Sequence, residues 1–312
     1  AFTAGPSGLR YIDFNGDGTA TILMDRMASD LAVLRYASGV ELQSITIQKD
    51  RVGEAPEQES PPPAVVQQST LQAMTFAGIP DSVPATTVSK VCGSGMQAVI
   101  FGLKTIALGD ADIVVAGGME SMSNVPYYLT QARTGYRMGH NKVVDGMIHD
   151  GLWDPYGDFH MGVAGEKCAK EYAFSREAQD ELAKESFRRA LAAQKEGQFD
   201  AEIVPVSVPQ KKGDAVMVSL DEGPPAGRPD KFATLKPAFQ KDGTITAANA
   251  SSINDGASAL VLASEKAVKE RNLEPLGRIV GYGGAAQAPE WFTTAPAAAI
   301  KSTTAKLGLT TD

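Results

Sequence analysis

A cysteine in a glycine-rich turn, Cys92, has the residue type and the surroundings for nucleophilic chemistry. It lies in the segment Val88-Ser-Lys-Val-Cys92-Gly-Ser-Gly-Met96. A cysteine attacks as its thiolate, and the N–H groups and positive dipole end at a helix N-terminus favour the thiolate over the thiol. Gly93 and Gly95 let backbone and substrate approach closely. The segment predicts a nucleophilic thiol, while a buried structural cysteine beside a glycine-rich turn explains these local features equally well.

The residues after Cys92 predict the elements that hold it. Apolar residues recur there at the spacing of one helical face. They are Met96, Val99, Ile100, Leu103, Ile106 and Ala107. A run rich in β-branched residues, 111–116, then predicts a buried strand. Cys92 is therefore expected at a strand-to-helix turn in a layered α/β core.

Further along, capping and turn residues predict more elements. A helix is expected from near Ser175, its cap, to near Gly197. Its i,i+4 ion pairs on the exposed side are Asp180 with Lys184 and Glu185 with Arg189. Residues 254–256 predict a turn, residues 257–263 a buried strand, and Ser264 the cap of another helix through about residue 271. Gly117 and Gly118 could allow close packing at the Cys92 turn or be ordinary loop glycines after a strand.

Several blocks of sequence carry a family resemblance. Besides the Cys92 segment and Asp112–Met122, they are Gly151–Tyr156, His160–Gly162, Glu202–Pro205, Leu235–Phe239 and Thr246–Gly256. Together they resemble the thiolase family, closest to its acetoacetyl-CoA type, from about residue 71 to residue 312. The resemblance implies an α/β fold of the layered αβαβα kind, with the second half incomplete in this chain.

The resemblance also implies an activity. Cys92 would be the cysteine that becomes acetylated when such thiolases condense two acetyl-CoA molecules to acetoacetyl-CoA, or run the thiolytic reverse. The chain would then be an acyltransferase of lipid metabolism, an acetyl-CoA C-acetyltransferase. Coenzyme A and acetyl-CoA would be its substrates, and no separate cofactor or metal is implied.

Matching residue by residue, the resemblance also places a substrate site. Leu152, His160 and Met161 would lie beside the pantetheine arm of coenzyme A, Ala247, Ser251 and Ile253 against its other side, and Phe239 along the nearby wall. Apolar groups can follow the pantetheine chain, while a hydroxyl and an imidazole can bond to its amides. Without the resemblance, His160 is more often a structural histidine and Ser251 more often a turn residue.

The sequence departs from the family in its catalytic groups. Thioester condensation needs a base, an acid/base for the α-proton and donors for two oxyanions. The family's Asn-Glu-Ala-Phe block, Gly-His-Pro block and second glycine-rich cysteine do not occur. Cys168 lies in a predicted helix and is interpreted as structural. We expect an incomplete or truncated thiolase; the alternative is a catalytically impaired thiolase-like protein or subunit that binds CoA esters. A cysteine hydrolase would need a histidine paired with Cys92, and none of the three histidines is near it in sequence.

Four segments are expected. They are a divergent N-terminal segment, 1–66; a thiolase N-terminal core from 67–118 with 244–274; a loop domain, 119–243; and the start of a truncated C-terminal domain, 275–312. The first segment contains three consecutive prolines, which oppose regular structure, and a replaced or frame-shifted first exon is the hypothesis for it. It also holds Asp13, Asn15, Asp17 and Gly18 at calcium-loop spacing, but Met24 stands where a carboxylate is required, so a simple turn is favoured.

Composition limits the class of protein. A net charge of −8 and a pI near 5.1 argue against a nucleic-acid-binding surface. No apolar run is long enough for a membrane span. The two cysteines lack metal-ligand spacing, so neither a disulfide framework nor a zinc site is indicated. The resemblance implies a homodimer or homotetramer. Tyr127-Tyr128 and Tyr136–Met138 either belong to a loop that packs against other subunits or are ordinary core aromatics. A cytoplasmic location is expected, or a mitochondrial one after removal of a leader.

Overall fold

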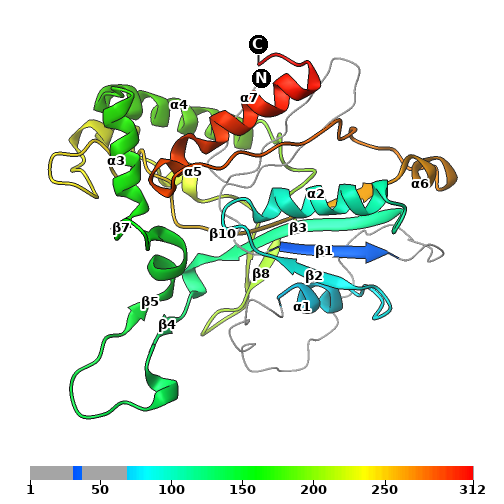
Figure 1. Cartoon of the computed structure of the whole chain (residues 1–312), viewed down its shortest axis with the longest axis horizontal. Helices are drawn as coiled ribbons and strands as arrows, with labels where there is room; N and C mark the ends of the chain where they lie inside the picture. The colour runs from blue at the N-terminus through cyan, green and yellow to red at the C-terminus, as the bar shows by residue number, and fades with distance from the viewer. Residues whose placement is uncertain (1–30, 37–68, 312) are drawn as a thin grey trace. The chain divides into compact units, whose positions relative to one another are not determined.

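The computed structural model describes residues 31–36 and 69–311, which form two compact units. We call residues 31–36, 69–152 and 253–282 the sheet unit, and residues 153–252 and 283–311 the helical unit. Figure 1 labels their helices and strands where there is room.

The sheet unit is built on a four-stranded antiparallel sheet in the order β10-β3-β1-β2. Its strands are β1 (Leu31–Tyr36), β2 (Ala85–Val88), β3 (Ile113–Ser121) and β10 (Asp255–Ala263). In the register of β3 and β10, Val114 lies opposite Leu262 and Ala116 opposite Leu260. Side chains alternate between the two faces of a strand, so these four apolar residues share one face.

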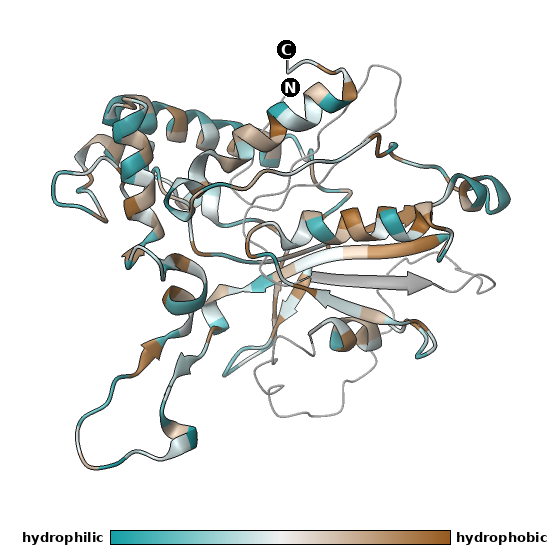
Figure 2. Cartoon of the chain, in the orientation of Figure 1, coloured by the Kyte–Doolittle hydropathy of each residue, from teal (hydrophilic) through white to brown (hydrophobic). Residues whose placement is uncertain are grey.

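Helices cover both faces of this sheet (Figure 1). Helix α2 (Ser94–Ala107) packs Ala98 and Val99 against the face of Val114 and Leu262. A Cβ on its Gly102 would lie 2.7 Å from the Leu262 side chain, so glycine at this position lets α2 pack close to the sheet. On the other face lie α1 (Ser69–Phe76) and α6 (Glu265–Glu270), which contribute Met74 and Ala267 to a second cluster. Figure 2 shows the apolar residues gathered along α2 and β3.

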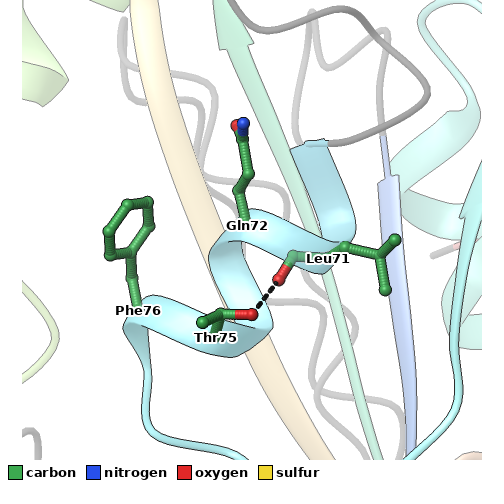
Figure 3. A pocket seen from close by; sticks show the side chains of 4 residues that line it. All are labelled: Leu71, Gln72, Thr75 and Phe76. Atoms are coloured by element: carbon green, nitrogen blue, oxygen red, sulfur yellow. Dashed lines mark hydrogen bonds between the residues drawn. The ribbon is translucent and has the colours of Figure 1, made fainter. Parts of the chain in front are cut away.

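Short elements complete the sheet unit. They are η2 (Met122–Asn124), β4 (Tyr127–Tyr128) paired with β5 (Val144–Asp145), η3 (Ala132–Thr134) and the π-helix η4 (Ile148–Leu152). A hollow beside α1 is lined by Leu71, Gln72, Thr75 and Phe76 (Figure 3). Thr75 Oγ1 donates to the Leu71 carbonyl at 2.8 Å. Because no acid, base or strong nucleophile lines it, this hollow is not a candidate site.

The helical unit is organised around α3 (Met161–Glu171) and α4 (Arg176–Lys195). Its other elements are β6 (Trp153–Asp154) paired with β7 (Phe159–His160), β8 (Val206–Val208) paired with β9 (Val216–Val218), α5 (Gly223–Ala226), η5 (Pro229–Thr234), η6 (Pro289–Thr294) and α7 (Ala295–Leu307). The Lys167 ammonium on α3 lies over the ring of Trp291 on η6, with Nζ 4.3 Å from the ring centroid. This contact attaches η6 to α3.

The predictions from capping residues are confirmed. Ser175 Oγ accepts from the Ala178 N–H at the start of α4, and Ser264 Oγ accepts from the Ala267 N–H at the start of α6. The exposed pair Glu185 and Arg189 also forms, with 2.7 Å between Oε1 and Nε.

Two local predictions are wrong, and in each case the residue bonds to a segment far along the chain. The sequence predicts a turn at residues 254–256, but Asp255 begins β10 and its carboxylate accepts from the Ser123 N–H at 3.0 Å. The sequence also pairs Asp180 with Lys184 on the exposed side, but Asp180 is 4% exposed and bonds instead to Arg176 and Asn249.

Gly117 and Gly118 lie within β3 and not in a loop after it. A Cβ on Gly117 would come within 2.6 Å of the Ser258 carbonyl oxygen on β10. The close approach of the two strands therefore requires glycine at position 117.

The possible calcium loop at 13–18 and the prolines at 61–63 lie outside the described residues, and the division into four segments stays a prediction. Among residues 31–36 and 69–311, no helix combines the length and apolar character of a membrane span. Within the same ranges, His, Cys, Asp and Glu do not gather into a group of three suited to a metal ion.

Candidate active site

Cys92 lies in the turn between β2 and α2, as the sequence predicts. β2 ends at Val88, and Gly93 is the N-cap residue of α2. Cys92 is exposed, so the interpretation of a buried structural cysteine is wrong. The turn therefore presents a thiol to solvent beside the positive end of a helix of 14 residues, which favours negative charge.

The buried side chain of Ser94 fixes this turn. Ser94 Oγ accepts from the Lys90 N–H and donates to the Val91 carbonyl, both at 2.7 Å, and the residue is fully buried. Val91 has a φ of 49°, in the left-handed region that a β-branched residue rarely adopts. Such a conformation costs about 1–3 kcal/mol and persists only where the surroundings impose it. The Ser94 hydroxyl imposes it directly before Cys92.

In the helical unit, His160 is the N-cap residue of α3. Its Nδ1 accepts from the Gly162 N–H at 3.0 Å. Because Nδ1 is an acceptor, the proton of the neutral ring lies on Nε2. Burial lowers the pKa of His160 below its ordinary 6.5, so the neutral form prevails at pH 7. The ring therefore offers an Nε2–H donor, which suits an amide carbonyl of a ligand.

Phe239 stacks on the His160 ring, with centroids 4.8 Å apart and planes inclined by 20°. Gly162 makes room for it, because a Cβ there would lie 2.3 Å from ring atoms of Phe239. Sequence reasoning missed this role of Gly162. The available signal was a glycine in the first turn of a helix, a position that is otherwise unfavourable for it.

The other predicted site residues lie on different elements. Leu152 ends η4, Met161 begins α3, and both are partly buried. Ala247 and Ser251 lie in the segment 244–251 of the helical unit and are exposed. Ile253 is exposed, and it belongs to the sheet unit with Cys92 and Leu152. Within the helical unit the structure thus brings His160 into contact with Phe239 and places Ala247 and Ser251 in one segment.

A polar cluster holds η4, which presents Leu152. Tyr128 Oη donates to Asp150 Oδ2 at 2.5 Å, and His149 Nδ1 lies 2.6 Å from Asp150 Oδ1. Burial raises the pKa of Asp150, but the hydrogen bonds from Tyr128 and His149 outweigh it, and the pKa falls below its ordinary value. Asp150 is therefore an anionic acceptor that attaches η4 to β4.

Comparison with protein families gives one match to this chain, the thiolase N-terminal domain, over residues 21–266. The match begins inside the segment that the sequence analysis describes as divergent. Among characterised proteins, acetyl-CoA acetyltransferase 2 of Arabidopsis thaliana is 52% identical over 240 residues, which are 76% of this chain and 60% of that protein. Acetyl-CoA acetyltransferase of Cupriavidus necator is 51% identical over 236 residues, 75% of this chain and 60% of its own length.

Solved structures agree with these relatives. The Acat5 thiolase of Ascaris suum, in complex with coenzyme A, has a TM-score of 0.72 and 44% identity, covering 77% of this chain and 61% of its own. The acetyl-CoA acetyltransferase of Bacillus anthracis has a TM-score of 0.74 and 42% identity, covering 78% and 61%. The chain thus spans about three fifths of the length of the relatives that it matches.

Proposed function

Because the chain belongs to the thiolase family, we propose that it acts in acetyl transfer from acetyl-CoA, with Cys92 as the residue that accepts the acetyl group. One observation carries the proposal. Cys92 is exposed on a turn that Ser94 fixes at the N-terminus of α2. The matched relatives, named acetyl-CoA acetyltransferases, support the choice of acyl group.

In the proposed acylation, the Cys92 thiolate attacks the thioester carbonyl carbon of acetyl-CoA. A bond forms between Sγ and that carbon, the carbon–sulfur bond to coenzyme A breaks, and the coenzyme A thiolate leaves and takes up a proton. A second acetyl-CoA gives up its α-proton to a base, and the resulting carbanion attacks the carbonyl carbon of the acetyl-cysteine. The bond between that carbon and Sγ breaks, which gives acetoacetyl-CoA and restores the Cys92 thiolate. In the thiolytic direction, the Cys92 thiolate attacks the ketone carbon of acetoacetyl-CoA, the carbon–carbon bond to the acetyl-CoA fragment breaks, and that carbanion takes up a proton. The coenzyme A thiolate then takes the acetyl group and releases the Cys92 thiolate.

Coenzyme A binding is the second part of the proposal. The Acat5 thiolase of Ascaris suum was solved in complex with coenzyme A, which supports this ligand class for the present chain. The neutral His160 would donate its Nε2–H to an amide carbonyl of pantetheine, with Phe239 as an apolar wall. Met161, Ala247 and Ser251 would line the same arm in the helical unit, and Leu152 and Ile253 are proposed contacts from the sheet unit.

A thiolysis assay tests the activity. Acetoacetyl-CoA and coenzyme A are incubated with the wild-type chain, with Cys92→Ser and with the matched control Cys168→Ser, whose cysteine lies partly buried on α3. We expect acetyl-CoA to form with the wild type and with Cys168→Ser but not with Cys92→Ser. Equal rates for all three proteins would show that Cys92 is not the acceptor.

The same assay separates this function from the alternative of the sequence analysis, a thiolase-like protein that binds CoA esters without turnover. Coenzyme A binding by calorimetry together with no acetyl-CoA in the thiolysis assay would support this candidate.

We also propose a role in lipid metabolism and a homo-oligomeric state. Exposed apolar side chains between β4 and β5 support the second proposal, since large exposed apolar groups gathered in one segment are typical of interfaces. They are Leu129, Tyr136, Met138 and Val143. Sedimentation equilibrium should give a dimer or tetramer mass, and a monomer mass at all concentrations would contradict it.

A further inference from the structure

We propose that Asn249 is a positioning residue for coenzyme A, because its side chain ties residues 244–251 to a buried carboxylate on α4. We call residues 244–251 the anchored loop. The inference rests on the proposed function for the identity of the ligand. It concerns how the exposed Ala247 and Ser251 are held in place.

The Asn249 side chain makes three hydrogen bonds. Nδ2 donates to Asp180 Oδ1 at 2.9 Å and to the Thr244 carbonyl at 3.1 Å, and Oδ1 accepts from the Thr246 N–H at 2.8 Å. Two of these bonds close the anchored loop on itself, and the third attaches it to α4. This pattern of two donors and one acceptor requires an amide, since a carboxylate has no proton to donate.

Asp180 is a fixed point for this attachment. It is 4% exposed, and its Oδ2 accepts from Arg176 Nε at 2.8 Å. Arg176 Nη2 in turn donates to the carbonyls of Phe232 and Leu235, at 2.7 and 3.0 Å. The buried carboxylate is thus held by an ion pair and additional hydrogen bonds, and removal of Arg176 would leave its charge uncompensated.

Glu166 on α3 holds the start of the anchored loop. It is 6% exposed and accepts from the Thr244 N–H at 2.9 Å, the Ile245 N–H at 2.8 Å and Thr244 Oγ1 at 3.0 Å. The chain passes so close that a Cβ on Gly243 would lie 2.3 Å from Glu166 Oε1. Two buried carboxylates on two helices therefore hold the anchored loop, Glu166 at residues 244–245 and Asp180 at Asn249.

The anchored loop also reaches the stacked pair. The Ile245 carbonyl accepts from the Ala238 N–H at 2.8 Å, directly before Phe239 in the chain. Thr246 is fully buried, whereas Ala247 and Ser251 are exposed. The buried side of the loop is thus fastened, and its exposed residues are the ones matched to pantetheine. Asn249 acts on coenzyme A through them and does not itself need to touch it.

The test uses a pair of exchanged residues. Asn249→Asp places a second carboxylate against that of Asp180. Asp180→Asn removes the negative charge that pairs with Arg176. In the double variant Asp180→Asn/Asn249→Asp, the new amide can donate to the new carboxylate, which still accepts from the Thr246 N–H. Glu185→Gln, on the exposed side of α4, is the matched control. Coenzyme A affinity is measured by calorimetry, and amide hydrogen exchange is followed peptide by peptide.

We expect Asn249→Asp and Asp180→Asn each to weaken coenzyme A binding by about tenfold or more and to speed exchange within 244–251. The double variant should recover part of the coenzyme A affinity and part of the protection from exchange. Glu185→Gln should match the wild type in both measurements. A positioning role predicts faster exchange confined to residues 244–251, whereas a loss of global stability speeds exchange throughout α3 and α4. If Asn249→Asp does not fold, Gln179→Ala loosens the anchored loop more mildly, because it removes the 2.9 Å hydrogen bond from Gln179 Nε2 to Thr244 Oγ1. A smaller loss of affinity is expected for it.

Wild-type affinity and wild-type exchange in Asn249→Asp would overturn the inference. So would single-variant losses with no recovery in the double variant and with faster exchange throughout α3 and α4. If the wild-type chain binds no coenzyme A, the proposed ligand is wrong and the positioning of coenzyme A is wrong with it. The exchange data then show separately whether Asn249 anchors the loop.

Discussion

At Gly162, a methyl group would occupy space that the Phe239 ring fills. Helix propensity alone predicts that Gly162→Ala stabilises α3 by up to about 1 kcal/mol. The 2.3 Å approach to the ring predicts the opposite, because an aromatic side chain held by stacking cannot easily move aside. We expect a lower Tm and weaker coenzyme A binding, measured by thermal unfolding and calorimetry.

Gly95 provides the control for this substitution. It is the second residue of α2, as Gly162 is of α3, but a Cβ there meets nothing within 4 Å. Gly95→Ala should leave the Tm unchanged or raise it. If both variants unfold at the same temperature, the contact with Phe239 does not constrain position 162.

The lowered pKa of His160 predicts a pH dependence of stability. Just below pH 6.5, the ordinary pKa of histidine, His160 is protonated in the unfolded chain but is still mostly neutral in the folded chain. Since the unfolded state then binds more protons, the contribution of neutral His160 to the free energy of unfolding is complete above pH 6.5 and falls as the pH drops below it.

Denaturant unfolding of the wild type and of His160→Gln, at pH values from about 8 to about 5, measures this dependence. The difference in free energy of unfolding between the two proteins should shrink toward low pH. A difference that grows on acidification would mean that the folded state favours the charged imidazole.

At the scale of elements, the turn before α2 combines an unfavourable backbone conformation with the hydroxyl that imposes it. Ser94→Ala removes both hydrogen bonds of that hydroxyl and should destabilise the chain by about 1–3 kcal/mol. In a Val91→Gly background the loss should be smaller, because glycine adopts positive φ without help. Denaturant unfolding of the wild type, the two single variants and the double variant measures the coupling energy between positions 91 and 94. An equal loss of stability in both backgrounds would contradict the proposed coupling.

Elements whose determinants are local could be predicted from the sequence. The helix caps Ser175 and Ser264 act on residues three positions away, and the glycine-rich turn precedes α2 directly. The prediction for Asp180 is wrong because its carboxylate is buried between Arg176, four residues earlier on α4, and Asn249, which lies 69 positions along the chain. Charge spacing on a helix gives no information about a loop that arrives from so far away.

At the scale of the whole molecule, the family resemblance predicts both the fold and the set of residues matched to the substrate. What it misses are the buried groups that hold those residues, since Glu166 and Asp180 look like ordinary helix-surface carboxylates in the sequence. The solved thiolases of Ascaris suum and Bacillus anthracis, with TM-scores of 0.72 and 0.74, show the same fold over about three quarters of this chain. The function proposed for it therefore depends on one covalent step at Cys92.

Mass spectrometry of the intact chain after incubation with acetyl-CoA, followed by peptide mapping, tests that step most directly. We predict one added acetyl group, located on Cys92, present in Cys168→Ser and missing from Cys92→Ser. An unmodified chain, or an acetyl group that remains in Cys92→Ser, would contradict the assignment of Cys92 as the acyl acceptor.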